Sequence, residues 1–119
     1  MNEYKKTIFL DIDGCVLKHQ GNLTKIILNK AKVLPGVIDK FNEWEALGYK
    51  IILTTGRKEC TRDITNQQLR EFGLFYHDLI MECHRGQRVI INDIKPDSNE
   101  TMAVSINLKR NEGLTGVNI

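Results

Sequence analysis

The stretch Thr7-Ile8-Phe9-Leu10-Asp11-Ile12-Asp13-Gly14 decides the fold: an apolar run of strand length ends in two acids and a glycine. Two later runs have the same form. Residues 50–54 (KIILT) lead into Thr55 and Gly56, and residues 88–91 (RVII) lead into Asn92 and Asp93. Apolar runs without alternation are typical of strands buried on both faces, as in a parallel sheet covered by helices. The sequence therefore predicts an α/β fold.

Two weaker runs, residues 77–81 and 103–106, bring the expected strands to five. Helical spacing of apolar residues predicts helices over residues 37–47 and 58–72, the first with Pro35 near its start and Gly48 just past its end. Between the first strand and first helix, two short apolar stretches flank a Gln-Gly-Asn turn, which indicates a β-hairpin flap at about residues 15–33. The expected architecture is a Rossmann-like three-layer sandwich with a mostly parallel five-stranded sheet.

Length, charge and cysteine content limit the classes of protein to which this chain can belong. The 119 residues suffice for one domain over residues 1–119, with 41% hydrophobic and 27% charged residues. A net charge of +2 without a basic stripe argues against a nucleic-acid partner. No apolar run approaches the roughly 20 residues of a membrane span, and no signal peptide is expected. Three cysteines without C-x-x-C spacing favour a reduced, cytoplasmic protein with neither disulfides nor a zinc knuckle.

Polar residues follow three of the predicted strands where each ends. Asp11 and Asp13 follow the first, Thr55 and Arg57 the second, and Asp93 the fourth. Parallel sheets bind ligands outside the carboxyl ends of their strands, so we expect these side chains to converge. An oxygen-rich cluster without Cys or His ligands suits Mg²⁺ better than Zn²⁺.

These residues also resemble a known family. Asp11-Ile12-Asp13-Gly14-Cys15-Val16 resembles motif I of the haloacid dehalogenase superfamily of phosphohydrolases, Leu53-Thr54-Thr55-Gly56-Arg57 resembles motif II, and residues 89–97 (VIINDIKPD) resemble motif IV. The resemblance spans residues 7–97 in the order and spacing of the family.

The resemblance implies a phosphatase mechanism. Asp11 is the expected nucleophile that forms an aspartyl-phosphate, and Asp13 the acid and base that serves the leaving oxygen and the water. Thr55 would hydrogen-bond the transferring phosphoryl group. The Mg²⁺ ligands implied are the Asp11 side chain, the Asp13 main-chain carbonyl and the Asp93 carboxylate. Further substrate contacts are expected from Gly56, Arg57 and Lys95.

One motif departs from the family pattern. The superfamily uses a Lys shortly before motif IV, but no Lys lies between Lys58 and Lys95. We assign the cationic role to Arg85, because Arg supplies charge and bidentate contacts to phosphate. Arg88, Arg57 and Lys95 are the alternatives, and Asp97 is a candidate additional metal ligand.

The spacing of the motifs leaves no room for a large cap domain, since residues 56–92 suffice for one helix and one strand. This resembles the capless phosphatases of surface-polysaccharide synthesis, so a small phosphosugar is the expected substrate. An open site also leads us to expect a homo-oligomer. Two alternatives stay open: a phosphatase of a macromolecular phosphate, on a nucleic-acid end or a protein, and a non-catalytic phosphosugar-binding module.

Overall fold

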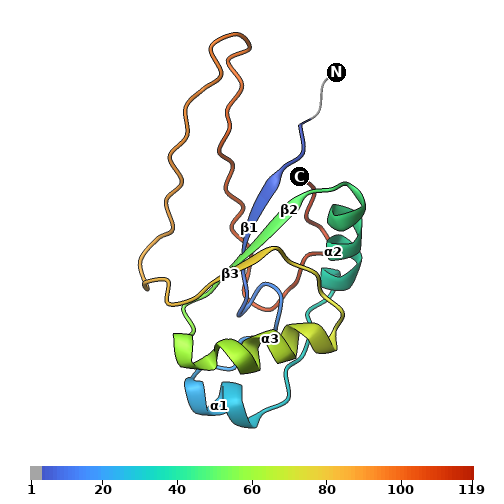
Figure 1. The fold of residues 1–119 in the computed structure, drawn as a ribbon, viewed down its shortest axis with the longest axis vertical. Coiled ribbons are helices and arrows are strands. Elements are labelled where there is room, and N and C mark those ends of the chain that lie inside the picture. The colour runs from blue at the N-terminus through green and yellow to red at the C-terminus, as the bar shows by residue number, and fades with distance from the viewer. Residues whose placement is uncertain (1–3) are drawn as a thin grey trace.

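The computed structural model describes residues 4–119 and confirms the predicted order of the first elements along the chain (Figure 1). Three strands, three α-helices and one 3₁₀-helix are present in this part of the chain. They are β1 (Thr7–Asp11), α1 (Leu23–Leu28), α2 (Val37–Ala46), β2 (Lys50–Thr54), η1 (Glu59–Thr61), α3 (Arg62–Glu71) and β3 (Asp78–Ile80).

The sheet is parallel, with strand order β1-β2-β3. Leu10, Leu53 and Leu79 are aligned across it and are all buried. The connections from β1 to β2 and from β2 to β3 run in the same direction across the sheet. Because such connections are right-handed, their helices α2 and α3 lie on the same face of the sheet. The core beneath them includes Phe41, Trp44 and Leu69.

The opposite face of the sheet is partly exposed. Phe9 is 52% exposed and Ile80 is 43% exposed, whereas Thr54 on the same face is buried. The predicted parallel α/β architecture is confirmed, whereas the five strands and the second helix layer of the predicted sandwich are not found in residues 4–119.

The predicted β-hairpin flap at residues 15–33 is not confirmed, because the segment contains an isolated antiparallel bridge, Leu17 to Val33, and no strand. Lys18 N donates to Lys32 O at 2.8 Å and Leu34 N donates to Val16 O at 2.9 Å, so the two ends of the segment run antiparallel. The tip is helix α1, because the Asn22 side chain accepts a hydrogen bond from Lys25 N and caps a helical turn.

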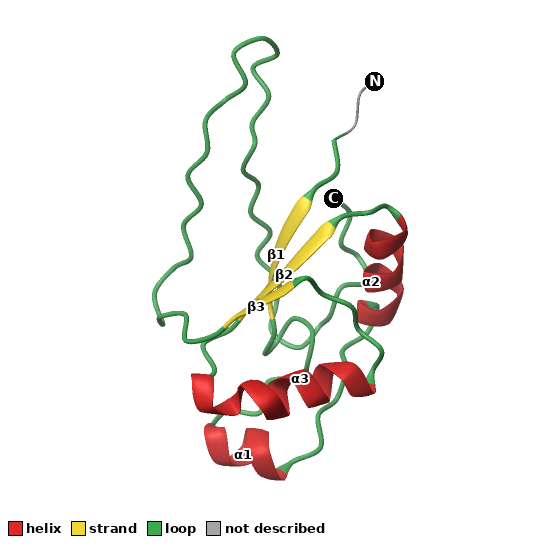
Figure 2. Cartoon of the chain, viewed as in Figure 1, coloured by secondary structure: helices red, strands yellow, loops and turns green. Residues whose placement is uncertain are grey.

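The two predicted strands at residues 88–91 and 103–106 are also wrong. Residues 82–107 instead form a long two-legged arm without a strand, drawn as loop throughout in Figure 2. An isolated bridge, Ile94 to Thr101, joins the legs near the tip. The apolar sequence favours extended backbone, but a strand also needs a neighbour to complete its hydrogen-bond ladder.

The segment after the arm folds back onto the sheet and its first loop. Leu114 is 1% exposed, and its N–H donates to Pro35 O at 2.8 Å. In the part of the chain that the structure describes, no helix has the length and apolar character to cross a membrane.

Candidate active site at the carboxyl ends of the strands

A tight turn after β1 presents Asp11 and Asp13 at the edge of the sheet. The N–H groups of Val16 and Leu17 both donate to Ile12 O, at 2.9 and 3.0 Å. Gly14 has φ +94°, a conformation that residues with a side chain rarely adopt. With Ile12 and Val16 fully buried, the turn is anchored in the core and its two acids face outward.

Asp11 lies in a partly desolvated position beside one cation. Burial raises the pKa of its carboxyl above the ordinary value, the Arg88 guanidinium opposes this, and Asp13 adds to it. Arg88 Nη2 lies 3.6 Å from Asp11 Oδ1, and 37% of the Asp11 side chain is exposed. Asp11 is therefore accessible to a ligand. Its neighbour Arg88 is of the residue type that most often binds phosphate through paired hydrogen bonds.

Asp13 has a different partner. Arg57 Nε donates to Asp13 Oδ2 at 2.9 Å and Arg57 Nη2 donates to Asp13 Oδ1 at 2.8 Å, a bidentate ion pair. The Arg57 side chain is almost fully buried. The two carboxylates thus sit in unlike surroundings, which is how neighbouring acids acquire separate chemical roles.

Thr55 and Gly56 follow β2 next to this pair. Thr55 is buried, and its hydroxyl oxygen accepts a hydrogen bond from Arg57 N at 3.1 Å. Its main chain bonds to the end of β3 and the residues that follow: Thr55 N donates to Ile80 O and Thr55 O accepts from Cys83 N, each at 2.9 Å. Gly56 is exposed at the same edge. The ends of β1 and β2 therefore converge as the sequence predicts.

The residues of the arm do not join this cluster. Lys95 Nζ lies 4.2 Å from the centre of the Tyr4 ring, which precedes β1 and so lies toward the opposite end of the sheet from Asp11. Arg85 is exposed and forms no ion pair with any residue from 4 to 119. Arg88, an alternative to Arg85 for the cationic role, does contact Asp11.

The donor set for a metal is incomplete in this arrangement. Over residues 4–119, no three His, Cys, Asp or Glu side chains come together as metal ligands. The Asp11 carboxylate and the Asp13 main-chain carbonyl remain as oxygen donors, which is the chemistry Mg²⁺ prefers, while the Asp13 carboxylate is bound by Arg57. Asp93 is carried by the arm, away from these two donors.

The segment at residues 108–119 contacts the turn after β1, a feature that sequence reasoning missed. Asn111 N donates to Gly14 O at 2.8 Å, and Asn111 Oδ1 accepts from His19 N at 2.8 Å. Neither the contact to Gly14 nor the one to His19 has a local sequence signal, because both partners are more than ninety residues away along the chain.

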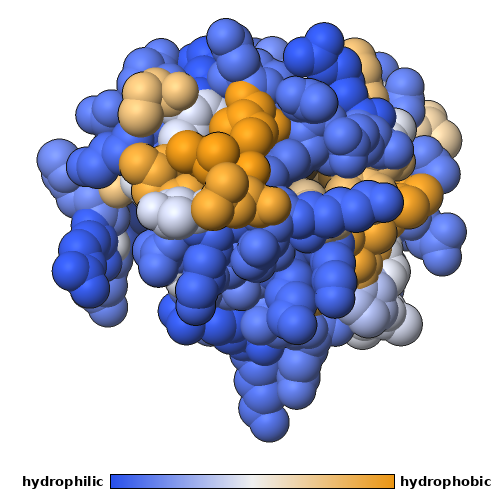
Figure 3. Space-filling view, turned by 90° about the horizontal axis from the view of Figure 1, so that it is seen from below, coloured by the Kyte–Doolittle hydropathy of each residue, from blue (hydrophilic) through white to orange (hydrophobic). Residues whose placement is uncertain are grey.

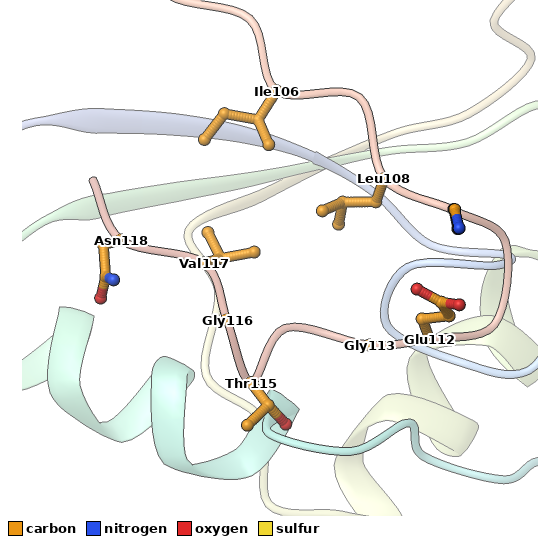
Figure 4. A pocket seen from close by; sticks show the side chains of 9 residues that line it. Ile106, Leu108, Glu112, Gly113, Thr115, Gly116, Val117 and Asn118 are labelled. Atoms are coloured by element: carbon orange, nitrogen blue, oxygen red, sulfur yellow. The ribbon is translucent and has the colours of Figure 1, made fainter.

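Two surface depressions lie outside this cluster. One, of about 450 Å³, is formed by the C-terminal segment, and in Figure 4 the side chains of Ile106, Leu108 and Val117 lie around it. The other, of about 630 Å³, runs along α3 at Asp63, Gln67, Arg70 and Glu71. Neither is lined by Asp11 or Asp13.

Comparison with protein-family models and with curated protein sequences finds no match. Among solved structures, the chain is similar to a D,D-heptose 1,7-bisphosphate phosphatase from B. bronchiseptica, crystallised with magnesium and phosphate. The similarity has a TM-score of 0.50 at 18% sequence identity and covers 82% of this chain. The chain spans 55% of the length of that phosphatase. At this identity the similarity shows the fold alone, a parallel α/β architecture.

Proposed function

We propose that this protein is a phosphomonoester hydrolase of the haloacid dehalogenase superfamily, with Asp11 as the nucleophile and Asp13 as the acid and base. The observation that carries the proposal is the contrast between two acids on one strand end. Asp11 is partly exposed beside Arg88, and Asp13 is held by a buried Arg57. This division suits a nucleophile that must reach a substrate and a proton-transfer group that must keep its orientation.

The reaction runs in two steps. An Asp11 carboxylate oxygen attacks phosphorus, the bond from phosphorus to the substrate oxygen breaks, and Asp13 gives that oxygen a proton. Asp13 then takes a proton from water, which attacks phosphorus, releases phosphate and regenerates the Asp11 carboxylate. Arg88 is the cation placed to contact the phosphoryl oxygens, in the role that the sequence had assigned to Arg85.

A Mg²⁺ requirement is part of the proposal. The cation would use the Asp11 carboxylate, the Asp13 carbonyl and Asp93, and when bound it would neutralise charge on the phosphoryl group. Because Asp93 stands on the arm, this ligand set requires the arm to approach β1. Asp93→Asn should raise the Mg²⁺ concentration for half-maximal activity at least about tenfold, whereas Glu100→Gln, at an exposed acid of the same arm with no assigned role, should change it little. Equal effects would remove Asp93 from the ligand set.

A small sugar phosphate is the proposed substrate class, in keeping with a cytoplasmic enzyme of surface-polysaccharide synthesis. Two observations support it: the similar solved structure is a heptose bisphosphate phosphatase, and within residues 4–119 the segments after β1 and β2 contain helices of at most ten residues. An uncapped site admits a polyol phosphate from the side without having to open a domain.

The test is phosphate release from a panel of sugar phosphates, with Mg²⁺ and with a chelator. Asp11→Asn should abolish release while leaving the fold intact, and Asp39→Asn, an exposed acid on α2, is the matched control. Metal-dependent release that survives in Asp11→Asn would refute the assignment of the nucleophile. Phosphate binding without release from any member of the panel would favour the binding-module alternative.

A further inference from the structure

Arg57 is a side chain with almost no hydrogen-bonding capacity left for a ligand. Nε and Nη2 donate to the two oxygens of Asp13, and Nη1 donates to Thr65 Oγ1 at 3.0 Å and to Gln68 Oε1 at 2.7 Å. Four of the five N–H groups of the guanidinium are thus used. Its side chain is 2% exposed. This geometry does not match the substrate-binding role expected from the sequence.

The same geometry is well suited to orienting Asp13. A planar fork bound at both carboxylate oxygens fixes the rotation of the carboxylate as well as its position. The guanidinium is in turn fixed by two buried side chains of α3, Thr65 and Gln68. The two oxygens of a carboxyl group have about four lone-pair sites and Arg57 uses one on each oxygen, so each oxygen of Asp13 keeps a free site. Such a site can carry the proton that is given to the leaving oxygen and can later accept a proton from water.

Gln68 extends this network to α1. Its Oε1 accepts from Arg57, and its Nε2 donates to Ile26 O at 3.0 Å. Helix α1 has six residues and none of them is buried, so few other contacts hold it. Leu23, Ile27 and Leu28 are exposed on it, and Figure 3 shows apolar side chains gathered at this end of the molecule.

We propose that Arg57 is a positioning residue for Asp13, and that Gln68 links the position of α1 to the Arg57–Asp13 pair. The inference rests on the proposed function. A substrate that contacts α1 would thereby influence the orientation of Asp13, the residue that transfers the proton. The connection runs from the Ile26 carbonyl to Gln68, from Gln68 to Arg57, and from Arg57 to Asp13.

The first test uses the leaving group. An alkyl phosphate needs a proton on its leaving oxygen, whereas 4-nitrophenyl phosphate loses a stable anion and needs little acid assistance. Arg57→Lys keeps a charge but cannot form the fork. Asp13 also serves the water in the second step, which both substrates share, so the comparison uses kcat/KM, which covers the steps up to phosphoryl transfer to Asp11. Arg57→Lys should lower kcat/KM about 100-fold on an alkyl phosphate and less than about fivefold on 4-nitrophenyl phosphate. A merely structural role or a substrate-binding role would lower kcat/KM equally on both substrates.

A double-mutant cycle tests whether Arg57 acts through Asp13. Asp13→Asn should show the same leaving-group pattern, and adding Arg57→Lys to it should cost less than about threefold more. A further 100-fold loss in the double mutant would overturn the proposal, because Arg57 would then act independently of Asp13.

The link to α1 is tested with Gln68→Glu, which keeps an oxygen acceptor for Arg57 but removes the donor to Ile26 O. Gln67→Glu, an exposed neighbour on α3 with the same charge change, is the control. Amide hydrogen exchange in α1 should accelerate at least about tenfold in Gln68→Glu and remain unchanged in Gln67→Glu. Unchanged exchange in both would overturn the link.

Failure of this inference is distinguishable from failure of the proposed function. If the wild type hydrolyses neither substrate, the phosphatase proposal is refuted, and the exchange measurement still tests the link. If the wild type hydrolyses both but Arg57→Lys lowers them equally, only the positioning role is refuted. Should Arg57→Lys not fold, Gln68→Leu, which removes the acceptor of Arg57 Nη1, should lower kcat/KM selectively on the alkyl phosphate. An equal loss on both substrates, or no loss on either, overturns the proposal.

Discussion

The Arg88 guanidinium lies 3.6 Å from the Asp11 carboxylate, although 77 positions separate the two residues in the chain. Arg88 is half-exposed and stands at the base of the arm, so it is free to move with a ligand. It is the cation closest to the proposed nucleophile among the residues that form ion pairs in the described structure. We therefore propose Arg88, in place of Arg85, for the role of the missing motif Lys.

Replacing Arg88 should affect both affinity and pH dependence. Arg88→Met should raise KM for a phosphomonoester at least about tenfold, since a charged hydrogen-bond donor to phosphate is lost. Because Arg88 lowers the pKa of Asp11, its removal should move the acid limb of kcat/KM to higher pH. Steady-state kinetics of Arg88→Met and Arg85→Met across pH checks this. A larger effect from Arg85→Met would restore the original assignment.

Asp11→Asn should stabilise the protein at neutral pH. Burial raises the Asp11 pKa in the folded state, so the folded protein binds this proton more tightly than the unfolded chain. The stabilisation that the protonated Asp11 carboxyl gives the folded state is therefore lost as the pH rises from about 3.8, its ordinary pKa, through the raised pKa of the folded state. The gain in Asp11→Asn should stay below about 1 kcal/mol, since the carboxylate is partly exposed and screened.

Urea denaturation at two pH values measures this effect. The free energy of unfolding of Asp11→Asn should exceed that of the wild type at pH 7 and match it near pH 3. An Asn variant less stable at pH 7 would mean that the charged carboxylate, paired with Arg88, is a net stabilising group.

Gly113 should tolerate no side chain. Its φ is +85°, and a Cβ atom there would lie 2.2 Å from Pro35 O, far inside contact distance. Gly113→Ala should lower the free energy of unfolding by at least about 2 kcal/mol. Gly116 has open space around it, so Gly116→Ala should stay within about 0.5 kcal/mol of the wild type. Equal denaturation midpoints for both variants would show that the C-terminal segment does not pack against Pro35.

The arm should exchange its amide hydrogens quickly. Val89 and Ile91 are 74% and 91% exposed, and the main-chain hydrogen bonds within the arm gather at its tip, between Lys95 and Glu100 and between Asn99 and Lys95. Amides of residues 88–91 should exchange near unfolded-chain rates while Ile51 and Leu53 of β2 stay protected. Protection of residues 88–91 equal to that of β2 would instead support the five-stranded sheet that the sequence predicts.

Local signals made the elements around the site predictable. The bounds of β2 follow from its apolar run, and α2 follows from the spacing of Val37, Phe41 and Trp44. The convergence of Asp11, Asp13 and Thr55 follows from parallel strands alone, because their carboxyl ends meet at one edge.

Features that depend on distant partners were not predictable. The run at residues 88–91 has the composition of a strand, but its exposure in the arm is decided by which neighbours it finds. The Arg57–Asp13 pair spans 44 positions and has no periodic pattern, so Arg57 read as a ligand-binding residue. The short helix α1 is set by one capping side chain, Asn22, within a segment whose turn residues resemble a hairpin.

The central claim is that Asp11 becomes phosphorylated during turnover. The direct measurement is mass spectrometry of the peptide around residues 7–16 after rapid quenching with substrate and borohydride reduction, in an Asp13→Asn variant whose second step is slowed. The account predicts a borohydride-dependent reduction product at Asp11 that is absent in Asp11→Asn. Phosphate release with no adduct at Asp11, or with the adduct on another residue, would contradict it.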